Sequence, residues 1–159
     1  MVSKWVRAGI SGAIAFLIAN IVSNILFFQL GRGILFEHEQ QSDKLIAVLF
    51  EMEPLPLMFT NGVLYLSLAA GIGVIHGLVF ALIEPVLPQH TLSRGLAFAA
   101  IVWALMALYF EFHAPFNMFG EPVILVLVEL VFWAVVLATE GIILSFGYGA
   151  SRSERYQHA

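Results

Sequence analysis

The sequence predicts an all-α integral membrane protein, a four-transmembrane-helix bundle with a short interfacial helix in the first extracytoplasmic loop. Of the 159 residues, 60% are hydrophobic and only 11% are charged, whereas charged residues make up about a quarter of a soluble protein. Four apolar stretches are also long enough to cross about 30 Å of hydrocarbon. These expected spans are residues 6–30, 57–82, 94–112 and 123–146. We therefore expect residues 1–159 to form a single transmembrane domain.

The composition also limits the partners and cofactors. The chain has no cysteine, which excludes disulfides, thiol redox chemistry and thiolate metal sites. Its net charge is −4 and it has no basic run, so nucleic acid is excluded as a partner. We expect a multi-pass protein of the cell membrane. Its partners are the lipid bilayer and either further copies, in a homo-oligomer, or another membrane protein.

The first span, residues 6–30, carries small residues at helical spacing. They allow close backbone approach between helices in a membrane, and they are Gly9, Gly12, Ala15, Ala19 and Ser23. Asn20 and Asn24 share a neighbouring face. We interpret these amides as hydrogen-bonding groups between helices, with a ligand role as the alternative.

Residues 31–56 form the only long connection, and acidic residues dominate it. Within it Ser42 can cap a short helix, whose apolar residues Leu45, Ile46, Leu49 and Met52 favour a position along the membrane interface. The run Glu37 to Glu39 contains carboxylate and imidazole groups. We interpret it as a solvated loop, because consecutive side chains do not converge on one ion without special backbone geometry.

The second span, residues 57–82, has the clearest packing signal. Small residues recur there at every fourth position, which predicts a close helix contact within the chain or between copies. This small-residue seam consists of Ala69, Gly73, Gly77 and Ala81. His76 points toward the same side. We expect it to form a hydrogen bond to a neighbouring helix, with titration or ligation as the alternative.

The third span, residues 94–112, ends in Glu111 and His113 before a proline at position 115. The two side chains are about 200° apart on an ideal helix. They can therefore meet at one ligand only if the helix ends between them.

The fourth span, residues 123–146, contains two carboxylates. Glu129 and Glu140 lie within roughly 20° of the same helix face and about 16 Å apart along the axis, with Trp133 and Val136 between them. Inserting a charged carboxylate at the bilayer centre costs about 3 kcal/mol of free energy on experimental insertion scales. We therefore expect both glutamates to face the interior of the bundle.

The basic residues predict the orientation in the membrane. Two of them, Arg32 and Lys44, fall on one side of the predicted topology. Five fall on the other side: Lys4, Arg7, Arg94, Arg152 and Arg155. The side with more basic residues is usually cytoplasmic, so both termini are predicted to be cytoplasmic.

Placing the spans antiparallel sorts the polar groups by depth. The outer polar cluster is expected to contain Glu111, His113, Asn24 and Asn61, together with Glu129. The expected ion or proton pathway consists of Glu129, Glu140 and His76, because carboxylates and imidazoles at staggered depths are typical of proton relays.

Three functions agree with this pattern. The favoured one is a conduit for protons, cations or small solutes, which uses the intramembrane glutamates and histidine. The second is a non-catalytic subunit or assembly partner of a larger membrane complex. The third is a metal or haem protein, in which Glu111, His113 and Glu129 hold zinc or iron, or a haem bridges two copies through His76. No cofactor is predicted under the favoured function, and no catalytic residue is identified, so enzymatic activity is not expected.

Overall fold

The computed structural model describes residues 3–156 of the chain, and the side chains of residues 3–149. The described part is helical and contains no strand. Four of its helical stretches are long and apolar enough to cross a membrane. They are Lys4–Leu30, Gly62–Val86, Thr91–Met118 and Val123–Gly149.

The first stretch is α1 (Lys4–Asn24), which continues through a π-helical turn at Ile25–Leu30. Its N-terminus is capped by the hydroxyl of Ser3, which accepts a hydrogen bond from the Val6 amide at 3.3 Å. The buried residues of α1 are all alanine or glycine: Ala8, Gly9, Gly12, Ala15 and Ala19. The helix therefore presents a smooth face to its neighbours.

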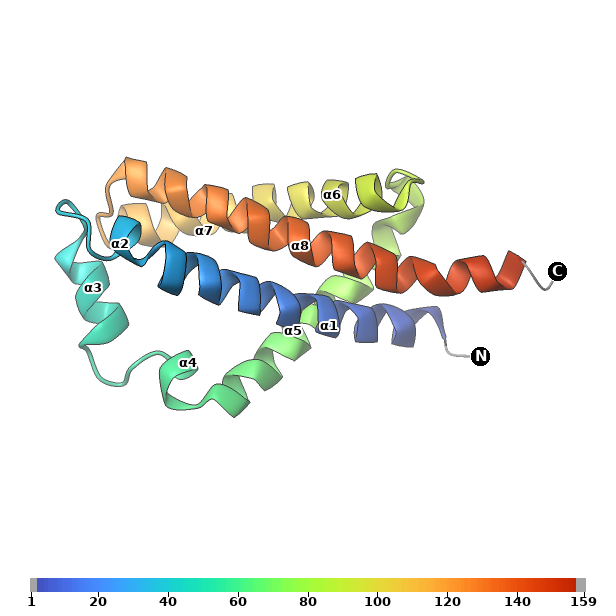
Figure 1. Ribbon diagram of the computed structural model, residues 1–159, viewed down its shortest axis with the longest axis horizontal. Helices are drawn as coiled ribbons and strands as arrows, with labels where there is room; N and C mark the ends of the chain where they lie inside the picture. Colours follow the sequence, from blue (N-terminus) through green and yellow to red (C-terminus); the bar gives the residue numbers. More distant parts are fainter. Residues whose placement is uncertain (1–2, 157–159) are drawn as a thin grey trace.

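The chain between the first and second apolar stretches folds into three short helices, α2 (Arg32–Leu35), α3 (Asp43–Phe50) and α4 (Leu57–Thr60). The hydroxyl of Ser42 caps α3 by accepting from the Leu45 amide at 3.3 Å, so the short helix expected after Ser42 is present. In Figure 1, α2 and α3 lie at the end of the bundle opposite the start of α1.

The second stretch, α5 (Gly62–Ile83), begins five residues later than the expected span at residue 57. The reason is local: Asn61 has a non-helical backbone, and its side-chain oxygen accepts a hydrogen bond from the Leu64 amide at 3.0 Å. Asn61 is therefore an N-cap that separates α4 from α5.

The third stretch extends further than the expected end at residue 112. It consists of α6 (Thr91–Val102), a π-helical turn at Trp103–Ala107, α7 (Leu108–Glu111) and a second π-helical turn at Phe112–Met118. Proline lacks the N–H that a regular α-helix needs. The chain accommodates Pro115 in the wider turn instead of ending the helix before it.

The fourth stretch, α8 (Val123–Tyr156), also continues beyond the expected end at residue 146. It lies along α1, and α6 and α7 run behind it in the view of Figure 1. The main helix pairs are α5 with α1, α1 with α8, and α8 with α6. Although α5 and α6 are consecutive in sequence, α5 packs mainly against α1 and α6 packs mainly against α8.

The small-residue seam contacts α1 within the same chain. A Cβ atom at Gly73 would lie 2.6 Å from the carbonyl oxygen of Gly12, and one at Gly77 would overlap the carbonyl group of Ala8. Ala69 and Ala81 are buried on the same helix. Because the backbones approach so closely, α5 can cross α1 and then diverge from it, as Figure 1 shows.

A second close contact joins α6 to α8. A Cβ atom at Gly95 would lie 2.5 Å from the carbonyl oxygen of Gly141. The sequence did not predict this pair, because only the tertiary packing of α6 against α8 brings the two glycines together.

Candidate functional site

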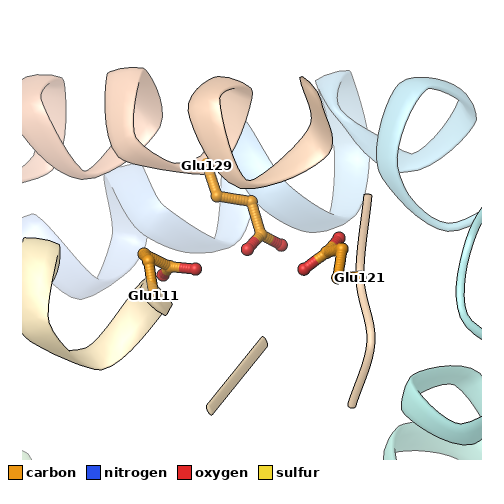
Figure 2. Close-up of side chains that lie close together, drawn as sticks. All are labelled: Glu111, Glu121 and Glu129. Atoms are coloured by element: carbon orange, nitrogen blue, oxygen red, sulfur yellow. The ribbon is translucent and has the colours of Figure 1, made fainter. Parts of the chain in front are cut away.

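Three buried glutamates from different parts of the chain form a carboxylate cluster. It consists of Glu111, Glu121 and Glu129, each of which contributes an oxygen atom within 4.8 Å of the other two. Their exposed fractions are 1%, 1% and 6%. Figure 2 shows the carboxyl group of Glu129 between those of Glu111 and Glu121. Such a cluster can hold shared protons or a cation.

The turn between α7 and α8 produces this arrangement. Glu111 ends α7, and the π-helical turn that follows carries the chain to Gly120. Gly120 has a φ of 74°, a conformation that favours glycine, and it reverses the chain. Glu121 follows directly, before α8 begins at Val123, and Glu129 projects from α8.

The surrounding side chains that donate hydrogen bonds to the cluster are neutral. The amide of Gln41 donates to Glu121 Oε1 at 2.6 Å and to the carbonyl oxygen of Leu35 at 3.0 Å. The indole N–H of Trp133 donates to Glu111 Oε1. The second carboxyl oxygens of Glu111 and Glu121 are buried and have no hydrogen-bond partner. The cluster therefore has two acceptor atoms that a proton or cation would satisfy.

Burial also affects the acidity of Glu121, which lies between the third and fourth apolar stretches. Desolvation raises the pKa of Glu121 above its ordinary value, and the hydrogen bond from Gln41 opposes this increase. Burial therefore makes Glu121 a weaker acid than a glutamate in water.

The connection between α1 and α5 covers this end of the bundle. Ser42 donates through Oγ to the carbonyl oxygen of Phe119 at 2.5 Å, and Lys44 donates through Nζ to the carbonyl oxygen of Met118 at 2.8 Å. Together with Gln41, these contacts attach α3 and the preceding loop to the turn that carries Glu121.

A cavity of about 630 Å³ adjoins the carboxylate cluster. Its walls come from α1, α3, α5 and the third and fourth apolar stretches. Glu111, Glu129 and Trp133 belong to its lining, whereas Glu121 does not. Tyr65 also lines it, and the hydroxyl of Tyr65 donates to Asn20 Oδ1 at 2.6 Å.

A second polar group lies further along α8. His76 Nδ1 and Glu140 Oε1 are 2.7 Å apart and share a hydrogen bond, and their side chains are 15% and 2% exposed. The sequence predicts both His76 and Glu140 in the proton pathway, and the structure brings the two together. Trp133 and the buried Val136 lie on α8 between Glu129 and Glu140.

Beyond the His76–Glu140 pair, toward the start of α1, lies an ion pair between Arg94 and Glu84. Arg94 Nη1 lies 3.4 Å from Glu84 Oε1, and Arg94 Nε donates to Ser145 Oγ at 3.1 Å. Glu84 therefore has a basic partner at the end of the bundle where α1 begins.

The expected place of His113 in the metal triplet and in the outer polar cluster is wrong. Its side chain is exposed, and its ring stacks on Tyr109 with centroids 5.2 Å apart. The helical path does not end between Glu111 and His113, so the two side chains remain on different sides. Glu121 takes the place of the histidine beside Glu111 and Glu129.

The outer polar cluster is also smaller than expected. Asn24 lines the same cavity as Glu111 and Glu129, but Asn61 is exposed and serves as the cap of α5. Glu121 is not among the residues predicted from the sequence, because it lies between a glycine and a proline, where the pattern indicates a turn. An acidic residue that opens a helix directly after a chain reversal is the signal that could have identified it.

Comparisons of the chain with protein-family models, curated proteins and solved structures gave no match. The chemistry of the buried side chains is therefore the basis for assigning a function.

Proposed function

We propose that the chain is an integral membrane protein that binds a cation in exchange for protons at the carboxylate cluster. One observation carries this proposal: three buried carboxyl groups have oxygens within 4.8 Å of one another. Two ionised carboxylates at this separation repel each other by about 3 kcal/mol at an effective dielectric constant of about 20. The cluster therefore needs protons when it is empty, and it can release them when a cation enters.

The surroundings of the cluster support exchange with an external cation. The hydrogen bonds to Glu111 and Glu121 come from Trp133 and Gln41, and neither donor carries a positive charge. The two buried oxygens without partners supply further ligand atoms. Carboxylate oxygens suit hard cations such as Mg²⁺, Mn²⁺ and Ca²⁺, as well as ammonium groups.

The proposed position in the membrane follows the four apolar stretches and the basic residues. We place the starts of α1 and α6 on the cytoplasmic side and the carboxylate cluster near the outer side. In this position α3, which begins after Ser42, lies along the outer interface. The seam of α5 is already occupied by α1 of the same chain, so it does not require a partner subunit.

The conduit predicted from the sequence adds a path toward the cytoplasm. The hydrogen bond between His76 and Glu140, on the same face of α8 as Glu129, favours this addition. In this proposal Glu111, Glu121 and Glu129 form the outer exchange site, and the His76–Glu140 pair accepts protons further inward.

Calorimetry on the purified full chain tests cation exchange. Titrations with Mn²⁺, Mg²⁺, Na⁺ and an organic ammonium ion, in two buffers that differ in ionisation enthalpy, give the number of protons released for each cation bound. We expect proton release from the wild type and its loss in Glu129→Gln, because an amide holds no exchangeable acidic proton. The proposal fails if no cation releases protons, or if Glu129→Gln behaves as the wild type does.

Glu140→Gln serves as the matched control, because it changes a buried glutamate of the same helix outside the cluster. It should retain cation binding and proton release in calorimetry. In vesicles that contain a pH indicator, it should lose cation-driven proton movement across the membrane. Normal proton movement in Glu140→Gln would contradict the inward path but would not contradict cation exchange at the carboxylate cluster.

A further inference from the structure

The cavity beside the carboxylate cluster is larger than a metal ion requires. Its volume of about 630 Å³ lies within the range of about 300–1,000 Å³ typical of pockets for small organic molecules. Two of the three cluster carboxyls, those of Glu111 and Glu129, belong to its lining. A molecule in the cavity would therefore contact the exchange site directly.

The charged side chains that line the cavity are all acidic. The lining contains the two glutamates, and among the described residues that form it there is no lysine, arginine or histidine. Its remaining polar groups are neutral, and several of its walls are aromatic: Phe27, Phe28, Phe36, Phe110 and Trp133. Aromatic faces attract organic cations. Both the carboxyl groups and the rings are therefore complementary to a positive charge.

The cavity reaches the lateral surface of the bundle. Ile21, Ile25 and Leu66 belong to its lining, and 61%, 39% and 49% of their surfaces are exposed. All three lie in apolar stretches that we place in the membrane. At the outer end, Ser42 and Lys44 attach the connection to the turn before α8. The accessible route is therefore from the side, where an apolar molecule would enter.

We infer that the cavity binds a lipophilic organic cation, with its positive group at Glu111 and Glu129 and its apolar body between α1, α3 and α5. This inference rests on the proposed function, because it names the class of cation exchanged at the same site. Charge balance sets the stoichiometry: one monovalent cation replaces one proton, which leaves a carboxyl group of the cluster as the cation forms its ion pair.

Tetraphenylphosphonium and the uncharged triphenylphosphine oxide provide a matched pair of ligands, because they share aromatic bodies but differ in charge. We expect the full chain in lipid nanodiscs to bind the phosphonium with release of one proton. The phosphine oxide should bind at least about tenfold more weakly, and Glu129→Gln should lose a similar factor for the phosphonium. Glu140→Gln should bind both ligands as the wild type does.

Two cavity variants separate this inference from the proposed function. Leu49→Trp on α3 and Leu66→Trp on the exposed side of α5 add bulk to the lining. Either variant that folds should lose phosphonium binding but keep proton release with inorganic cations or with the smallest ammonium ion. If those cations release protons from the wild type but the phosphonium does not bind to it, the cavity is not a site for lipophilic cations, whereas the proposed cation exchange is retained.

The remaining outcomes also overturn the inference. Equal binding of the two ligands would indicate a site for neutral lipids. Equal phosphonium binding by the wild type, Glu129→Gln and both tryptophan variants would indicate dissolution in the lipid alone. An oligomer that Leu49→Trp dissociates would indicate that a second copy of the chain fills the cavity.

Discussion

Glu121 differs from the other two members of the carboxylate cluster because a distant part of the chain holds it. Gln41 donates to Glu121 Oε1 across 80 positions of sequence. The same amide group also donates to the carbonyl oxygen of Leu35. Any change in the protonation or cation binding of Glu121 therefore acts directly on the connection that covers the cluster.

The raised pKa of Glu121 predicts a dependence of stability on pH. The folded state binds the proton of Glu121 more tightly than the unfolded chain does, so its stabilising contribution is complete below the unfolded pKa of about 4.5. The contribution is lost as the pH rises through the raised pKa of the folded state. In chelator, the wild-type Tm should therefore fall as the pH rises above about 4.5, and the fall should be smaller in Glu121→Gln.

Glu39→Gln is the control for this measurement, because Glu39 is an exposed glutamate of the same connection. It should retain the wild-type slope of Tm against pH. An unchanged slope in Glu121→Gln would show that the proton bound on folding belongs to another group.

At the scale of the helices, the crossing of α1 and α5 depends on glycine at two positions. A side chain at Gly73 or Gly77 would meet the backbone of α1, whereas a Cβ at Gly71 has no other atom within 4 Å. Gly73→Leu and Gly77→Leu should each destabilise the protein by about 3 kcal/mol or more, since rigid backbone cannot move aside. Gly71→Leu should have little effect on thermal unfolding in detergent.

The same variants distinguish a contact within the chain from one between copies. Gly73→Leu should lower the unfolding temperature without changing the oligomer size. A change in oligomer size at unaltered stability would place the contact between copies instead.

The spacing of apolar and small residues and the capping residues predicted where the helices lie better than which helices pack together. The seam from Ala69 to Ala81 and the cap at Ser42 are local patterns, and both correspond to observed contacts. The pairing of Gly95 with Gly141 is tertiary, and the sequence of neither helix indicates which helix is its partner. The exclusion of His113 from the cluster depends on the helix continuing through Pro115, which proline chemistry alone does not predict.

At the scale of the whole molecule, the basic residues are sorted between the two ends of the bundle. Arg7 and Arg94 lie on the helices that begin at one end, and Arg32 and Lys44 belong to the connection at the other, as Figure 1 shows for α1, α6, α2 and α3. The side chains of Arg152 and Arg155 lie outside the described residues. This sorting favours the predicted orientation, in which both termini are cytoplasmic.

Reporter fusions test that orientation. A reporter at the C-terminus should be active only as a cytoplasmic fusion, and one inserted in residues 40–44 should be active only outside the cytoplasm. Reporters that lie on the same side would contradict the four-span arrangement.

The exposed side chains of Ile21 and Leu66 at the cavity make the bilayer the reservoir from which a ligand would be drawn. The concentration that governs occupancy is then the mole fraction of ligand in the lipid, set by its partition coefficient. At a fixed total amount of ligand, added empty vesicles dilute this fraction. They would weaken the apparent affinity although no contact in the protein has changed.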